Sequence, residues 1–162
     1  MLGGTYPTEV FRQFNSVPKE THKIYSEIAH TYDSNYTDSL CRTEDKFLSS
    51  YLMSRIPPGA RILDVGCGTG LLIRLLNIPP DRYLGIDPSE GMLAFARQNY
   101  PEHKFESLSA EDLACSSTFG KFDAVVGLFG VFSYIDDPAS TLCGLVNIMN
   151  PTGRLIMMAY TH

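Results

Sequence analysis

The sequence predicts a doubly wound α/β fold built around a mostly parallel sheet. From residue 61 onward, short apolar segments alternate with amphipathic segments to the end of the chain. Alternation of this kind indicates parallel strands joined by crossover helices that cover both faces of a sheet. The first apolar segment runs into the glycine-rich turn GCGTG at residues 66–70, and ligands of such folds bind beyond the carboxyl ends of the strands. The length of 162 residues suits one domain with its own core.

Two helices are predicted before the first strand. Residues 20–32 and residues 43–56 each place apolar side chains on one helical face. Pro57 and Pro58 are followed by Gly59, and this combination ends the second helix because proline cannot continue it.

The later elements alternate along the chain. Strands are predicted at 61–66, 83–87, 104–110, 122–130 and 154–160, and the helices between them at 70–77, 88–101 and 136–149. Ser89 is expected to cap the helix at 88–101. Asp137 caps the next helix, with Pro138 in its first turn. Residues 150–153, NPTG, are expected to form a turn.

Composition limits the classes of function. The net charge of −5 disfavours a nucleic-acid partner, because it leaves no broad basic surface. No apolar run approaches the ~20 residues that span a bilayer, and the N-terminal residues lack the pattern of a secretory signal. The four cysteines are scattered, without a Cys-x-x-Cys pair. This spacing predicts no metal site and no disulfide framework, and it favours the cytoplasm.

Gly66, Gly68 and Gly70 occupy alternate positions directly after the first predicted strand. The missing Cβ atoms let a ligand approach the backbone and permit positive φ angles. The spacing departs from the dinucleotide fingerprint Gly-x-Gly-x-x-Gly, because the third glycine comes one residue early. Asp64 precedes the turn and would repel a pyrophosphate but attract a ligand that carries an ammonium and a sulfonium. The alternative is a tight strand–helix turn that binds nothing.

Four motifs in order resemble a known family. LDVGCGTG at 63–70 resembles the first motif of class I S-adenosylmethionine-dependent methyltransferases. GIDPSEGMLAFAR at 85–97, SAEDL at 109–113 and FDAVVGLFGVFSYIDDP at 122–138 resemble the later ones. HTYDSNY at 30–36 resembles the lead-in of small-molecule enzymes of ubiquinone and menaquinone synthesis (methyltransferase type 11/25).

The resemblance implies a Rossmann-like sheet of about five strands in the order 3-2-1-4-5. It also implies an N-terminal helical lid at residues 1–40, a core at residues 41–162, and S-adenosyl-L-methionine as cofactor.

The resemblance assigns cofactor contacts to particular residues. Asp87 ends the second predicted strand, where its carboxylate can accept both ribose hydroxyls. Met92 is expected to pack on the adenine, with an ordinary core position as the alternative. Asp112, with the adjacent Glu111, is expected to accept from the adenine amino group. As bare sequence, these two acids equally suit the first turn of a helix. Tyr36, in the N-terminal segment, is expected to close over the cofactor.

The glycine turn carries two further assignments. Asp64 is expected to orient the turn and face the methionine ammonium, and Cys67 to fill the loop rather than act as a nucleophile. Phe129 and Phe132 follow the fourth predicted strand and are candidates for the methyl end of the pocket. Tyr32 is either part of the closing segment or a core aromatic.

No catalytic residue is assigned from the sequence. In-line displacement at a sulfonium methyl depends mainly on holding the acceptor atom in position. A base is needed only if the acceptor must lose a proton, and His22, His30 and Tyr134 are the candidates.

The chain departs from the family at its end. The family's sheet usually has seven strands, whereas this chain stops at His162, directly after its fifth predicted strand. That strand would be an apolar edge, which invites pairing. Three explanations stay open: a cut from a longer enzyme, a homo-oligomer paired through the fifth strand, or cover by the N-terminal segment.

The expected function is transfer of a methyl group to a small-molecule acceptor. The second hypothesis is a binding module, or a fragment of a longer methyltransferase, that holds the cofactor without turnover. An NAD-dependent oxidoreductase is third and is disfavoured by the glycine spacing. The acceptor atom stays open among oxygen, nitrogen, carbon and sulfur.

Overall fold

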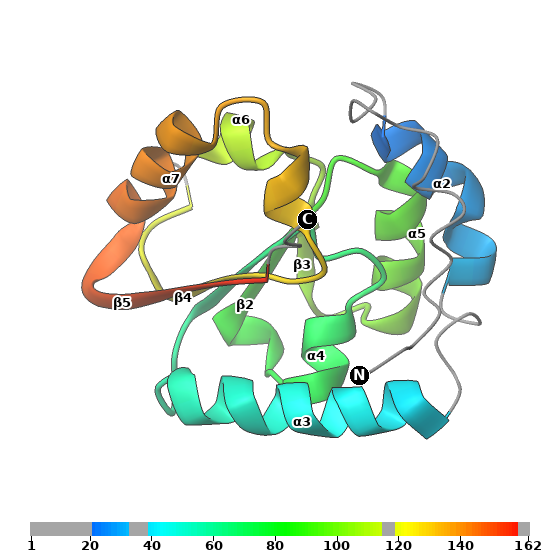
Figure 1. The fold of residues 1–162 in the computed structure, drawn as a ribbon, viewed down its shortest axis with the longest axis horizontal. Coiled ribbons are helices and arrows are strands. Elements are labelled where there is room, and N and C mark those ends of the chain that lie inside the picture. The colour runs from blue at the N-terminus through cyan, green and yellow to red at the C-terminus, as the bar shows by residue number, and fades with distance from the viewer. Residues whose placement is uncertain (1–20, 33–38, 115–118, 159–162) are drawn as a thin grey trace, which may run out of the picture.

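Five parallel strands form one sheet in the order β3-β2-β1-β4-β5, which confirms the predicted fold and strand order (Figure 1). The structure is a computed structural model, and it describes residues 21–32, 39–114 and 119–158. The strands are β1 Ile62–Val65, β2 Tyr83–Ile86, β3 Lys104–Glu106, β4 Phe122–Gly127 and β5 Met149–Met157.

Helices cover both faces of the sheet (Figure 1). They are α2 Thr21–Tyr32, α3 Ser39–Arg55, α4 Leu71–Leu76, α5 Glu90–Asn99, α6 Ala110–Ala114 and α7 Pro138–Asn147, with short 3₁₀ turns η2 Pro80–Arg82 and η3 Val131–Tyr134. Ser89 and Asp137 cap α5 and α7 as predicted, each side chain accepting from a backbone N–H of the first turn. None of the helices within these ranges has the length and apolar character needed to cross a bilayer.

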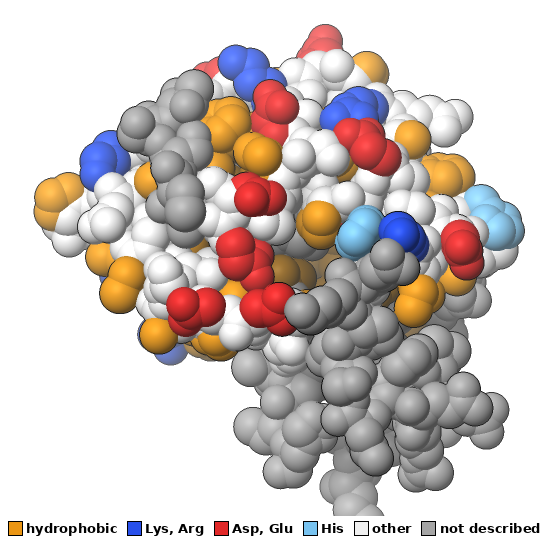
Figure 2. All heavy atoms as spheres, turned by 90° about the horizontal axis from the view of Figure 1, so that it is seen from above, with side chains coloured by type: hydrophobic (Ala, Val, Ile, Leu, Met, Phe, Trp, Pro, Cys, Tyr) orange, Lys and Arg blue, Asp and Glu red, His pale blue; other side chains and the backbone are white. Residues whose placement is uncertain are grey.

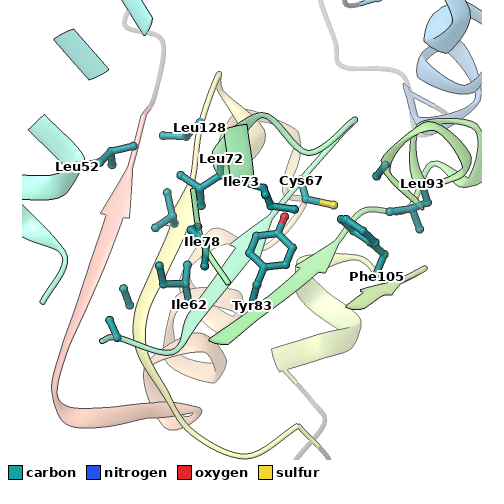
Figure 3. Close-up of a cluster of buried hydrophobic side chains, with 14 residues drawn as sticks. Leu52, Ile62, Cys67, Leu72, Ile73, Ile78, Tyr83, Leu93, Phe105 and Leu128 are labelled. Atoms are coloured by element: carbon teal, nitrogen blue, oxygen red, sulfur yellow. The ribbon is translucent and has the colours of Figure 1, made fainter. Parts of the chain in front are cut away.

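The central strands are apolar on both sides, because a parallel sheet between two helical layers has no solvated face. One face of the sheet packs against α3, α4 and α5 through a cluster that includes Leu52, Ile62 and Leu93 (Figure 3). The other face packs against α6 and α7 through Leu113 and Leu145. Residue 64 of β1 lies level with residue 85 of β2 and residue 126 of β4, so the carboxyl ends of these strands meet at one edge.

The strand predicted over 104–110 is wrong after Glu106, because Ser109 accepts from the amide of Asp112 at 3.0 Å and starts α6. The turn predicted at 150–153 falls inside the bounds of β5, but these residues bulge out of the pairing with β4. The register passes from Phe122 opposite Met149 to Ala124 opposite Arg154. There Asn150 donates from Nδ2 to Oδ1 of Asp123 at 2.6 Å. A proline at this point is tolerated because β5 lies at the edge of the described sheet.

The fourth strand is shorter than the predicted 122–130. It ends at Gly127, after which Phe129 and Gly130 adopt positive φ angles of 52° and 78°. This left-handed pair turns the chain back, so that η3 follows directly. The turn brings Val131 against the glycine turn after β1.

Candidate cofactor site

The three glycines of the turn after β1 have different surroundings. Gly66, Gly68 and Gly70 all have positive φ, at 68°, 54° and 98°. A Cβ at Gly66 would lie 2.3 Å from the Val131 side chain, and one at Gly70 would lie 2.7 Å from the Tyr100 ring. A Cβ at Gly68 would meet no atom of the described residues within 4 Å. Packing therefore accounts for the first and third glycines, and among the described residues nothing covers the second.

Asp87 joins the end of β2 to this turn. Its Oδ2 accepts from the amide of Gly68 at 3.0 Å, and its Oδ1 accepts from the amide of Ser89 at 2.8 Å. A carboxylate oxygen has two acceptor positions, so both oxygens can still accept from a ligand. Burial raises the pKa of Asp87, and the two amide hydrogen bonds oppose that rise. The half-buried acid thus lies beside the open glycine.

Asp64 lies beneath the turn and is only 3% exposed. The hydroxyl of Tyr83, on the neighbouring strand, donates to its Oδ2 at 2.7 Å. Burial raises the pKa of the Asp64 carboxyl to about 7; the Tyr83 hydrogen bond lowers it and the charge of Asp87 adds a smaller rise. A nearby cation lowers the pKa of such a carboxyl, because an opposite charge favours the ionised form. Because the pKa of Asp64 is about 7, this shift would increase its ionised fraction at neutral pH.

Cys67 fills the space under the turn and is 4% exposed. Its sulfur and the Tyr83 hydroxyl both lie close to Gly85, where a Cβ would stand 2.9 Å and 2.8 Å from them (Figure 3). Burial, and then the charges of Asp64 and Asp87, raise the pKa of the Cys67 thiol. The thiol is therefore neutral at physiological pH, which disfavours a role as a nucleophile.

The predicted adenine contacts lie on α5 and α6. Met92 is 2% exposed, and its amide donates to the capping oxygen of Ser89. Asp112 is exposed and accepts from the Ser109 hydroxyl at 2.8 Å, so it forms part of a helix cap. Glu111 is half-buried and accepts from the amide of Asp136 at 3.3 Å. Both acids therefore occupy the first helical turn that the sequence offered as the alternative, and their contact with adenine stays a prediction.

The candidates from the N-terminal segment lie on α2. Tyr25 contacts both Tyr32 and Tyr134, at ring-centroid distances of 6.1 Å and 6.4 Å. His30 is exposed and bonds to the carbonyl of its own helix at Glu27. Of the candidates for a base, Tyr134 thus lies in a contact between α2 and η3, and His30 faces solvent. The predicted contact at residue 36 falls outside the described residues, as Tyr36 is not among them.

The two phenylalanines after β4 pack in different ways. Phe132 lies over Gly127, where a Cβ would stand 2.4 Å from its ring. Phe129 packs against the cluster that faces α3 and α4. The structure therefore places Phe132 directly at the carboxyl end of β4, whereas Phe129 belongs to the core on the other side of the sheet.

Acidic side chains gather on the face of the molecule seen in Figure 2. The net charge of the whole chain is −5. A negative surface attracts cationic ligands and raises their local concentration. The electrostatics therefore favour a positively charged small molecule over a nucleotide phosphate.

Sequence reasoning missed Tyr83 and Ser26. Tyr83 lies two residues before Gly85 on the same side of β2, and the pairing of β1 with β2 brings its hydroxyl to Asp64. The alternation of side chains along the strand was an available signal, since residues 83 and 85 must share a face. Ser26, on α2, contacts Ser89 at 2.8 Å, and no motif marks it.

Comparison with known proteins identifies the family. Residues 63–155 match the family described as a methyltransferase domain. A ubiquinone biosynthesis O-methyltransferase of Aromatoleum aromaticum is 31% identical over 151 residues, covering 87% of this chain and 62% of that protein. A malonyl-acyl-carrier protein O-methyltransferase of Anoxybacillus flavithermus is 26% identical over 140 residues, covering 85% of this chain and 51% of that protein.

A solved structure has the same fold. It is that of CalS10 with bound S-adenosylmethionine, an amino pentose methyltransferase of Micromonospora echinaspora involved in calicheamicin biosynthesis. The TM-score is 0.66 at 23% identity, with 81% of this chain and 56% of that chain covered. The chain thus spans little more than half the length of the relatives it matches. Its matched domain, its strand order and its glycine turn together place this chain in the class I S-adenosylmethionine-dependent methyltransferase family.

Proposed function

We propose that this chain binds S-adenosyl-L-methionine at the turn after β1 and transfers its methyl group to a small-molecule acceptor. The observation that carries the proposal is the contact between Asp87 and Gly68. The acid at the end of β2 accepts from the amide of Gly68, the glycine of the turn that no described residue covers. This open backbone beside a carboxylate suits a ligand that carries a diol and an amino-acid tail.

The proposed roles follow from the positions of the side chains. Asp87 accepts the ribose hydroxyls, and Asp64 balances the methionine ammonium from beneath the turn. Gly68 leaves the backbone of the turn open to the ligand, Gly66 and Gly70 let the turn pack closely against its protein neighbours, and Cys67 fills the space below it. Met92 packs on the adenine, with Glu111 and Asp112 near its amino group. Tyr36 is proposed to close over the cofactor from the N-terminal lid, residues 1–40, against the core, residues 41–162.

The chemistry needs little from the protein beyond position. S-adenosylmethionine supplies an electrophilic methyl carbon, and the carbon–sulfur electron pair stays with sulfur as the acceptor lone pair forms the new bond. The chain's part is to hold the two partners in line and exclude water, which can supply roughly 7–11 kcal/mol. A deprotonating base is required only for an acidic acceptor group, so no catalytic residue is proposed.

The acceptor is proposed to be a small molecule that is methylated on oxygen. Both curated relatives are named as O-methyltransferases, so oxygen is the first acceptor atom to test. The rival function, a cofactor-binding module without turnover, is distinguished by the products. Release of S-adenosylhomocysteine with a pool of phenolic and carboxylic acceptors supports the enzyme, whereas tight binding without release supports the module.

A titration separates the proposal from a dinucleotide enzyme. Isothermal calorimetry with S-adenosylmethionine, S-adenosylhomocysteine and NAD should give saturable binding for the first two alone. Asp87→Asn is the matched variant, because it keeps the shape of the side chain and removes its charge. Binding of NAD, or equal binding of S-adenosylmethionine by the variant, would contradict the proposed function.

We also propose a homo-oligomer that pairs through β5, in the cytoplasm. Within the described residues β5 pairs with β4 alone, and Met157 near its end is 43% exposed. Cys67 and Cys143, within the part of the chain that the structure describes, are free thiols, which suits a reducing compartment. Light scattering of the purified chain tests the pairing, and a strictly monomeric mass would contradict it.

A further inference from the structure

Helix α2 crosses the start of α5 at very close approach, and the two helices lie side by side (Figure 1). The point of contact is Gly91, the second residue of α5. A Cβ there would stand 2.7 Å from both the Cα and the carbonyl oxygen of Ser26. These are backbone atoms and cannot rotate away, so α2 can lie in this place only because residue 91 has no side chain.

We call this close contact at Gly91 the notch. The side chain of Ser26 links the notch to the cofactor site. Its Oγ lies 2.8 Å from the Oγ of Ser89 and accepts from the amide of Gly91 at 3.4 Å. Ser89 is 1% exposed, caps α5, and donates its own amide to Oδ1 of Asp87 at 2.8 Å. A continuous series of hydrogen bonds therefore runs from α2 through Ser89 to the Asp87 carboxylate.

Other residues of α2 fit the same arrangement. His22 lies one helical turn before Ser26, and its charge favours the ionised form of Asp87. Ala29, in the following turn, is 4% exposed. Next to Ala29 on the same helix, the hydroxyl of Tyr25 lies 3.5 Å from that of Tyr134 on η3. Helix α2 thus contacts the segments that follow both β2 and β4.

We propose that Ser26 is a positioning residue for the methyl donor: seated in the notch at Gly91, it holds the Ser89 turn so that the Asp87 carboxylate stays directed at the ribose. This inference rests on the proposed function. It assigns to α2 a part in binding that does not require α2 to touch the reacting atoms. Hydrogen bonds between buried groups are worth most where neither partner can turn to water, which applies to Ser89.

Two variants test the role of Ser26 by calorimetric titration with S-adenosylhomocysteine. Ser26→Ala removes the hydroxyl and adds no atoms, and we expect the Kd to rise about three- to tenfold, the worth of one hydrogen bond. Gly91→Ala fills the notch, and we expect at least the same loss, although alanine is the better helix former within α5. Trypsin should also cleave after Lys23 faster in Gly91→Ala without any ligand, because α2 no longer seats.

The matched control is Thr31→Ala, which removes a hydroxyl from the exposed side of the same helix and should leave the Kd unchanged. A double-mutant cycle with Asp87→Asn separates positioning from a general loss of structure. If Ser26 acts through Asp87, the effect of Ser26→Ala should disappear in the Asp87→Asn background. A structural defect would instead give the same loss in both backgrounds.

The outcomes distinguish this inference from the function on which it rests. A wild-type chain that binds neither S-adenosylmethionine nor S-adenosylhomocysteine overturns both. A wild-type chain that binds, together with a Ser26→Ala variant of unchanged Kd, overturns the role of Ser26 alone. An effect of Ser26→Ala that persists fully in Asp87→Asn overturns it as well. If Gly91→Ala fails to fold, the double-mutant cycle of Ser26→Ala with Asp87→Asn still tests whether Ser26 acts through Asp87.

Discussion

The hydroxyl of Tyr83 donates a 2.7 Å hydrogen bond to Oδ2 of Asp64, and both residues are buried beneath the glycine turn. The pair links the start of β2 to β1. It lies below the glycine turn, where the amino-acid end of S-adenosylmethionine is proposed to bind. The groups that face Asp64 are Tyr83, Cys67 and Asp87. Only the Tyr83 hydrogen bond favours its ionised form, since burial and the charge of Asp87 both oppose it.

Replacing Tyr83 with phenylalanine should move the pH dependence of cofactor binding to higher pH. The pKa of Asp64 is about 7, so affinity for S-adenosylmethionine should rise as the pH rises through this value and the carboxyl ionises. Tyr83→Phe removes the hydrogen bond that lowers this pKa, so the midpoint should move to higher pH. Calorimetric Kd values from pH 6 to 9 measure it, with the exposed Tyr51→Phe as control. An unchanged midpoint would separate Asp64 from the binding of the ammonium.

Asp64→Asn should change how stability depends on pH. The pKa of Asp64 is raised from 3.8 to about 7 in the folded chain. The folded state therefore holds its proton more tightly than the unfolded state, and this contribution is present below pH ~4 and lost as the pH rises through 7. The stability of Asp64→Asn relative to wild type should increase across that window, by at most about 4 kcal/mol.

Urea unfolding at pH 5 and pH 8 measures this difference. Asp81→Asn is the control, because Asp81 is exposed in η2 and should show the same difference from wild type at both pH values. A constant difference between Asp64→Asn and wild type would mean that Asp64 titrates normally.

Asp87→Ala should weaken binding of S-adenosylmethionine by tenfold or more. Hydrogen bonds to a charged group are worth roughly 1.5–3 kcal/mol each, and the proposed site uses this carboxylate for the ribose. The amides of Gly68 and Ser89 also lose their acceptor, so part of the loss should appear as a lower free energy of unfolding. A Kd equal to that of wild type would remove Asp87 from the site.

Alanine at Gly68 and at Gly66 should have different effects. At Gly68 the new Cβ meets no atom of the described part of the chain within 4 Å, so Gly68→Ala should cost stability only through its left-handed backbone, roughly 1–2 kcal/mol, while cofactor affinity falls at least tenfold. At Gly66 the Cβ would strike Val131 at 2.3 Å, so Gly66→Ala should destabilise the fold further.

The double variant Gly66→Ala, Val131→Ala is the internal control for this pair. It removes the two closest contacts, those with the Val131 methyl groups, and should be more stable than Gly66→Ala alone in urea unfolding. Wild-type affinity in Gly68→Ala would mean that the ligand does not approach this glycine.

Much of the fold was predictable because its signals are local. The alternation of strands and helices, the caps at Ser89 and Asp137, and the position of the glycine turn all follow from periodicity and turn chemistry over short stretches. The strand predicted as far as residue 110 is an error because Ser109 caps a helix there. Residues 150–153 carry a turn signal and bulge out of the pairing of β5 with β4.

The sequence by itself determined the fold class and the strand order that the family implies. It also singled out the acids at residues 64 and 87 as candidates beside the glycine turn. Motif spacing and periodicity are properties of the chain, so no packed structure was needed for these conclusions. Only the tertiary structure decided which glycine faces open space, that Tyr83 bonds to Asp64, and that Ser26 reaches Ser89. These contacts join residues that lie far apart in the sequence. They depend on the register of parallel strands and on how closely two helices approach, which only the packed molecule defines.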